Sequence, residues 1–224
     1  QHLGSGGHST DGGGAVYLVV EGRTSLASNA VIRADGVSIE DGAGGAGGSI
    51  YLRTGGLDGA GALHADGGAG LNAGAGGRVA VILTGAGEAF DAFTSAGGRI
   101  AAYGGLASRD PAAAGTVYLQ TGDRYAAAEV GKLIVDNNGR GVSNESISTR
   151  LLSGVDATAF SSIVVRNRGV LEIHDPAVPF DFQELSSKID GDADWSAAVR
   201  IASDASGNIS FTNAAVISGY TLTL

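Results

Sequence analysis

The chain has no cysteine, and only three of its 224 residues are proline. Without cysteine, neither a disulfide framework nor a thiolate-ligated metal site can form. The scarcity of proline excludes a collagen triple helix, which needs glycine at every third position and abundant proline. No apolar run approaches the roughly 18 residues that a membrane-spanning helix requires. We therefore expect no disulfide scaffold and no membrane span.

Charged and aromatic side chains are also scarce, at 17% and 6% of the chain. The formal net charge of −9 would repel a phosphate backbone, so we expect no nucleic-acid partner. Hydrophobic residues still make up 43% of the sequence, which argues against disorder. Most of them have small or branched aliphatic side chains, which suit a narrow core built from stacked layers.

Glycine is abundant, with 39 residues, and it separates short strand-like units that repeat. A first unit of small residues followed by alternating apolar residues occurs at 12–18, 47–52, 76–81 and 114–119. A second unit follows it at 31–36, 62–67 and 92–97. The repeat length of about 34 residues, with no intervening helix, is typical of a solenoid. The glycine-rich stretches between units predict corners, or extended chains that pack closely because no Cβ blocks their approach.

Alternation within the repeat predicts which side chains enter the core. In the unit around Tyr51 we place Ile50, Leu52 and Thr54 on the inner face and Tyr51 and Arg53 on the outer face. Four tyrosines, Tyr17, Tyr51, Tyr103 and Tyr118, could then form an outward ladder. Such a ladder would stabilise successive coils, or its aromatic faces could bind sugar rings.

The composition changes near residue 126, where glycine becomes rarer and β-branched residues more frequent. We divide the chain into glycine-rich β-helix repeats at 1–125 and a less glycine-rich continuation of the same β-helix at 126–224. The candidate strands of this second part are 132–136, 162–166, 170–173, 199–202, 208–212 and 220–224. An antiparallel β-sandwich would give the same local pattern and is the alternative for this part. The strand-like end predicts that the native chain continues past residue 224.

The repeats resemble those of very long secreted bacterial surface proteins. The resemblance rests on Gly47-Gly-Ser-Ile-Tyr-Leu-Arg-Thr54, on Ala114-Gly-Thr-Val-Tyr-Leu-Gln-Thr121 and on Gly131-Lys-Leu-Ile-Val-Asp136. It implies a right-handed parallel β-helix of the pectin-lyase-like type, and it covers about residues 12–140. It says little about activity, because one fold carries many functions.

Few residues form a pattern that could carry chemistry. Asp190, Asp192 and Asp194 have the spacing of hard oxygen ligands in a Ca²⁺ loop, although Trp195 follows where an EF-hand has glycine. We interpret His64 and Asp66 as variable surface decoration, and Glu172 and His174 as a solvated strand face. No set of residues converges on nucleophile, base and oxyanion roles, so we expect no enzyme.

The sequence thus predicts an all-β parallel solenoid that serves as a structural or adhesive segment of a large exported protein, at the cell surface or in the extracellular space. The expected partners are adjoining repeats or domains and surface glycans, with self-association along the solenoid axis as a further option. The alternative functions are a carbohydrate-active β-helix enzyme, either a polysaccharide lyase or a glycoside hydrolase, and a carbohydrate-binding module.

Overall fold

The protein folds as a parallel β-solenoid of about 4 turns. The structure is a computed structural model, and it describes residues 3–140, 147–152, 159–174, 181–182, 184–186, 198–201, 216–218 and 221–223. Only two short helices occur among these residues, α1 (Asp91–Ser95) and α2 (Gly122–Ala126). The prediction of an all-β solenoid is therefore confirmed.

The first block of the solenoid has a main sheet and two smaller sheets, all with parallel strands. The main sheet contains β1 (Ala15–Leu26), β3 (Ser49–Gly59), β6 (Arg78–Leu83) and β9 (Thr116–Gln120). The second contains β2 (Val31–Arg33), β4 (Ala62–His64) and β7 (Arg99–Ala101). The third contains β5 (Gly70–Asn72) and β8 (Ala107–Asp110).

Side chains at equivalent strand positions form ladders in the core. Ile50 pairs with Val79 in the next coil, and Val79 pairs with Val117 in the coil after that. All three are buried, as are Leu52 and Thr54. The predicted inner face of the repeat is therefore confirmed. The Thr54 hydroxyl lies within hydrogen-bond distance of the Gly22 and Gly56 carbonyls, which explains why a polar side chain is tolerated there.

The third copy of the second repeat unit was placed wrongly at 92–97. That segment contains α1, and the strand that pairs with Ala62–His64 is β7. Phe90 and Phe93 are buried and lie three residues apart, a spacing that brings two side chains to one helix face. Both rings belong to the hydrophobic core of the first block, so this segment is buried as a helical turn and not as a strand.

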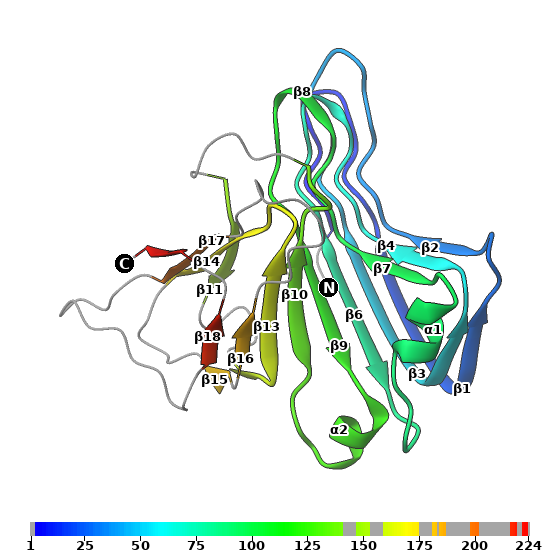
Figure 1. Cartoon of the computed structure of the whole chain (residues 1–224). Helices are drawn as coiled ribbons and strands as arrows, with labels where there is room; N and C mark the ends of the chain where they lie inside the picture. Colours follow the sequence, from blue (N-terminus) through cyan, green and yellow to red (C-terminus); the bar gives the residue numbers. More distant parts are fainter. Residues whose placement is uncertain are drawn as a thin grey trace.

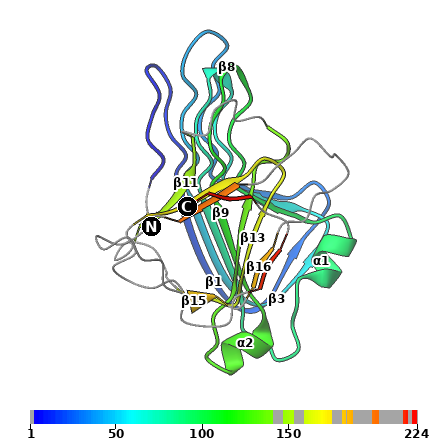
Figure 2. The ribbon, with the colours of Figure 1, turned by 60° about the vertical axis from the view of Figure 1, so that its left-hand side comes forward.

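A glycine arm projects from the first block. We use this name for residues 4–13, 35–48, 66–77 and 103–115, whose limbs run out from the sheet and back to it (Figures 1 and 2). Within a coil, the Gly45 amide donates to the Val37 carbonyl at 2.9 Å. Between coils, the Gly68 amide donates to the Gly45 carbonyl at 2.8 Å. The arm is therefore hydrogen-bonded in two directions.

The limbs of the arm lie too close together for side chains. A Cβ on Gly36 would lie 1.8 Å from the Gly45 carbonyl oxygen, and a Cβ on Gly74 would lie 1.9 Å from the same oxygen. Glycine at such positions is needed for space, because the backbone itself occupies the volume that a side chain would take. The predicted close packing of extended glycine-rich chains is confirmed.

The strands reverse direction after β9. The chain passes through α2 and returns as β10 (Lys132–Asp136), which pairs antiparallel with β9. β13 (Ser162–Arg166), β16 (Glu184–Ser186) and β18 (Val216–Ser218) then follow β10 in parallel, so one sheet of eight strands runs through the molecule. The connection at 121–131 contains the predicted change of composition near residue 126.

The strands after the reversal form a second parallel block. β11 (Thr149–Leu152), β14 (Val170–His174), β17 (Ala198–Ile201) and β19 (Thr221–Thr223) make one sheet. β12 (Ala159–Phe160) pairs with β15 (Asp181–Phe182). All of these pairings are parallel, so the antiparallel sandwich considered for this half is wrong. The predicted strand at 208–212 lies outside the described residues.

The core changes to the other side of the sheet at the reversal. Ile134 lies opposite Val117 and packs against the core of the first block. Its neighbours Leu133 and Val135 are buried, and Leu133 lies opposite Tyr118, whose side chain points away from that core. In Figure 1 the sheet β2–β4–β7 accordingly lies to the right of the main sheet, and β11–β14–β17 lies to its left.

Candidate functional site

The outward side of the first block carries a surface that we call the outer face, defined by Tyr17, Tyr51, Ser49, Arg78 and Thr116. Ser49, Arg78 and Thr116 lie in one row across β3, β6 and β9. The tyrosines lie in the next row, two residues further along the strands. Because the second block has its core on this same side, the outer face borders the junction of the two blocks.

Two tyrosines of the outer face form a stack. The rings of Tyr17 and Tyr51 have centroids 5.0 Å apart and planes inclined by 8°. Tyr17 is 60% exposed, so the ring at the end of the stack presents a free face. Burial raises the pKa of Tyr51, with a further contribution from the neighbouring Tyr17 hydroxyl.

The predicted ladder of four tyrosines is only partly correct. Ala80 interrupts the row between Tyr51 and Tyr118. Tyr118 serves the junction of the two blocks: its hydroxyl accepts a hydrogen bond from the Gly131 amide at 2.7 Å, and its ring lies 6.5 Å from Phe160. Tyr103 lies on the segment after β7 and belongs to a different cluster.

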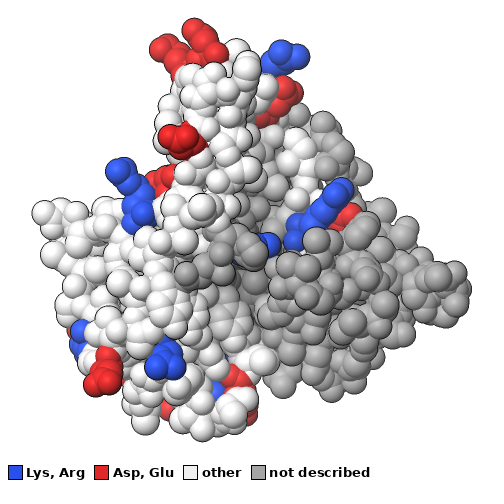
Figure 3. Space-filling view, turned by 180° about the vertical axis from the view of Figure 1, so that it is seen from behind, with Lys and Arg blue, Asp and Glu red and all other residues white. Residues whose placement is uncertain are grey.

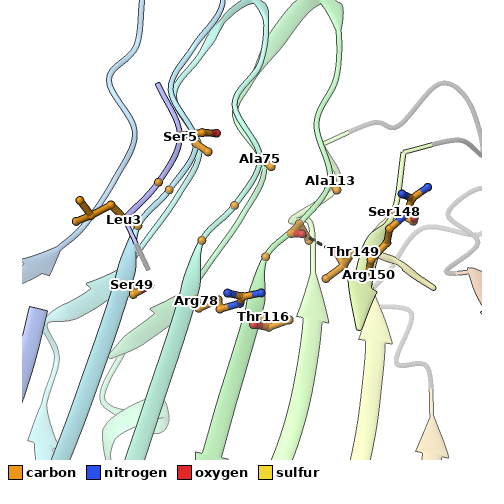
Figure 4. A pocket seen from close by; sticks show the side chains of 18 of the residues that line it. Leu3, Ser5, Ser49, Ala75, Arg78, Ala113, Thr116, Ser148, Thr149 and Arg150 are labelled. Carbon is orange, nitrogen blue, oxygen red and sulfur yellow. Dashed lines mark hydrogen bonds between the residues drawn. The ribbon is translucent and has the colours of Figure 1, made fainter. Parts of the chain in front are cut away.

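A groove of about 280 Å³ lies beside the outer face at the junction. Figure 4 shows Ser49, Arg78 and Thr116 at the starts of their strands, with Thr149 and Arg150 across from them. The Thr149 hydroxyl donates to the Ala114 carbonyl at 2.6 Å, which ties the two sides of the groove together. Hydroxyls, backbone amides and two guanidinium groups give this groove a polar lining.

A polar cluster lies at the base of the glycine arm. The strand β4 ends at His64, and Asp35 and Asp66 occupy equivalent places just after β2 and β4. His64 Nδ1 lies 2.8 Å from Asp35 Oδ1, and the same oxygen accepts the Asp66 amide at 2.7 Å. The His64 side chain is only 12% exposed, so the interpretation of His64 as surface decoration is wrong.

Tyr103 and two arginines surround this cluster. The Tyr103 amide donates to Asp66 Oδ1 at 2.8 Å. The guanidinium carbons of Arg140 and Arg99 lie 5.2 and 5.9 Å from the centre of the Tyr103 ring. Burial raises the pKa of the Asp66 carboxyl; the Tyr103 amide and Arg140 oppose this effect, and Asp35 adds to it.

An open groove of about 440 Å³ adjoins the cluster. Asp35 and Asp66 line it together with Arg33 and Arg140. The groove therefore brings two carboxylates and two guanidinium groups to one place, and His64 contacts one of these carboxylates, Asp35. A signal for this arrangement was present in the sequence, because Ala-Asp-Gly occurs at 34–36 and again at 65–67.

Of the other predicted site residues, the structure describes the side chain of Glu172 alone. Asp190, Asp192 and Asp194 lie outside the described residues, so the Ca²⁺ loop remains a prediction. Glu172 lies on β14, where its carboxylate accepts the Ser148 hydroxyl at 2.6 Å and Arg150 Nε at 3.2 Å.

The visible surface and the comparisons give no further indication of a site. Over the described residues on the face in Figure 3, acidic and basic side chains lie scattered among uncharged ones. Each of the two described helices has five residues, so no helix in this part of the chain could cross a bilayer. No family model, curated protein or solved structure matches the chain.

Proposed function

We propose that the chain is a structural or adhesive segment of a large exported protein that acts at the cell surface or in the extracellular space. The observation that supports a structural role best is the glycine arm, whose limbs hydrogen-bond both within and between coils. The absence of a Cβ at Gly36 and Gly74 lets the limbs lie close enough for these hydrogen bonds to form. A rigid projection on a stacked core suits a segment that holds a binding surface at a fixed place.

The adhesive part of this proposal assigns surface glycans to the outer face. The stacked rings of Tyr17 and Tyr51 offer a flat apolar surface with one free side, and the adjacent groove is lined by the Thr116 hydroxyl and the Arg78 guanidinium. Tyrosine has an apolar ring and a polar hydroxyl, so it suits ligands that have both apolar and hydrogen-bonding groups. A sugar has this character, since its ring C–H groups can cover an aromatic face while its hydroxyls make hydrogen bonds.

Binding of the purified chain to immobilised glycans tests the adhesive role. Tyr17→Ala and Tyr51→Ala should each weaken binding to a captured glycan about tenfold, because each removes one ring of the stack. Leu106→Ala is the matched control, since Leu106 is 61% exposed but lies on the glycine arm, away from the outer face. Loss of binding in all three variants, or in none, would reject the outer face as the glycan contact.

A carbohydrate-active enzyme is the second candidate, and the polar cluster favours it. Polysaccharide cleavage requires an acid and a base, and Asp66, whose pKa is raised by burial, lies beside Asp35 at an open groove. A screen of acidic and neutral polysaccharides separates the two candidates. Turnover that disappears in Asp66→Asn would replace the structural proposal, whereas glycan binding without turnover supports it.

A further inference from the structure

We propose that Asp35, His64 and Asp66 bind a divalent first-row transition-metal ion, with Zn²⁺ as the first choice. One ligand atom from each of the three side chains lies within 4.8 Å of the other two. The cluster plays no part in the outer face or in the adhesive role proposed above. A test of the metal site is therefore independent of a test of the adhesive role.

The backbone of two adjacent coils fixes the positions of these residues. The Ala34 amide donates to the His64 carbonyl at 2.9 Å, and the Gly36 amide donates to the Asp66 carbonyl at 2.9 Å. These two hydrogen bonds lie on either side of Asp35 and hold it against the neighbouring coil. The three ligands are thus arranged by the same coil stacking that builds the fold, before any ion arrives.

The donor atoms select the class of metal. Two carboxylates and one imidazole suit Zn²⁺ and its neighbours, which bind aspartate oxygen and histidine nitrogen at about 2.0–2.2 Å. Calcium and magnesium prefer sites made of oxygen atoms alone, so the imidazole disfavours them. An ion that takes His64 Nδ1 and Asp35 Oδ1 as ligands would replace the direct 2.8 Å contact between these atoms.

Backbone amides around the cluster hold its two carboxylates in place. The Tyr103 amide already donates to Asp66 Oδ1, and the Asp66 amide donates to Asp35 Oδ1. Hydrogen bonds of this kind orient the ligating carboxylates of metal sites. The cluster also gathers two carboxylates around a largely buried imidazole, and a divalent cation would neutralise their charge.

Three protein ligands leave at least one coordination position on a tetrahedral ion. Asp35 and Asp66 line the groove of about 440 Å³, so this position would face an open space. Arg33 and Arg140 line the same groove. An oxygen donor from outside the chain, such as water or a carboxylate, could complete the coordination there.

A purely structural role for the cluster makes a different prediction. The contact between Asp35 and His64 joins two coils without an ion, and its loss would lower stability while leaving metal affinity unchanged. The two roles are therefore separated by measuring metal binding and thermal stability on the same variants.

The test is a titration of the tag-free, metal-stripped chain with Zn²⁺, followed by calorimetry, and with Co²⁺, followed by its visible absorption. We expect one ion per chain at this site, and at least tenfold weaker binding in His64→Gln and Asp66→Asn. Asn at position 66 keeps an oxygen that can accept the Tyr103 amide, so this variant preserves the local hydrogen bond. His8→Gln is the control, because His8 is exposed and lies outside the cluster.

The wild-type chain provides a readout that does not depend on the folding of a variant. Zn²⁺ should shift the NMR signals of the His64 ring, and an excess of Ca²⁺ should not reverse the shift. The proposal is overturned if Zn²⁺ leaves the His64 signals in place, or if folded His64→Gln binds Zn²⁺ as tightly as the His8→Gln control.

Discussion

Replacing Gly74 with alanine should destabilise the glycine arm. The new Cβ would lie 1.9 Å from the Gly45 carbonyl oxygen, whereas ordinary contacts begin at 3.4 Å, so one limb must move by about 1.5 Å. That oxygen accepts the Gly68 amide, and the Gly74 amide donates to the Gly68 carbonyl, so the shift weakens two hydrogen bonds. At about 0.5–1.5 kcal/mol each, their loss costs roughly 1–3 kcal/mol, which matches the usual cost of overpacking.

Gly14→Ala is the matched control for this substitution. A Cβ at Gly14 meets nothing within 4 Å, and alanine restricts the unfolded chain, so we expect a gain of about 0.4–1 kcal/mol. For a chain of this length, 1 kcal/mol shifts Tm by about 2–4 °C, so thermal unfolding followed by circular dichroism resolves the difference. Amide hydrogen exchange should also become faster in the arm of the Gly74 variant. If Gly74→Ala melts at or above the temperature of Gly14→Ala, the steric reasoning for the arm is refuted.

Three further predictions concern the core, the junction of the blocks and the response to pH. Leu133→Ala should lower the free energy of unfolding in urea by about 2–5 kcal/mol, because Leu133 is buried in the second block. Lys132→Ala should change it little, because Lys132 is exposed. Equal losses of stability in the two variants would contradict the side of β10 that we assign to the core. Asn137→Ala should cost about 3 kcal/mol by the same assay, because this buried amide bonds to Gly104, Ala112 and Arg140 and its loss leaves buried groups unpaired; an unchanged unfolding midpoint would refute that role. Burial raises the pKa of Tyr103 above 10.0, with Asp136 and Asp66 adding to the effect, so the stability that this phenol contributes is complete below pH 10 and is lost as the pH rises through the native pKa. The unfolding free energy of the wild type should therefore fall more steeply above pH 10 than that of Tyr103→Phe. If the two proteins lose stability with pH at the same rate, the raised pKa of Tyr103 is refuted.

Local patterns predicted the strands well. The segments 132–136 and 162–166 were expected from their β-branched residues and alternation, and they coincide with β10 and β13. Inner and outer faces around Tyr51 also followed from alternation, since the side-chain period of a strand is two. The reversal after β9 could not be predicted this way, because a strand has the same local pattern whether its partner runs parallel or antiparallel to it.

The candidate site was harder to predict than the fold. His64 and Asp66 were noticed, but their equivalents differ from coil to coil: in the observed register His64 lies opposite Arg33 and Ala101, so the repeat alone gives no sign of a site. The contact of His64 with Asp35 depends on which coils are neighbours, and the burial of Phe93 in α1, just before β7, likewise depends on tertiary packing. Asp35 and Asp66 occur in the same Ala-Asp-Gly motif, at 34–36 and 65–67, but only the stacking of the coils brings their carboxylate oxygens together.

The simultaneous change of strand direction and core side at β9 and β10 has a consequence for chirality. Reversing the strands alone would turn the second block into a helix of the opposite hand to the first. Moving the core across the sheet as well is equivalent to a half-turn about the stacking axis, and a rotation preserves handedness. Both blocks can therefore wind in the same sense, and neither needs the left-handed crossover that parallel strands almost never use.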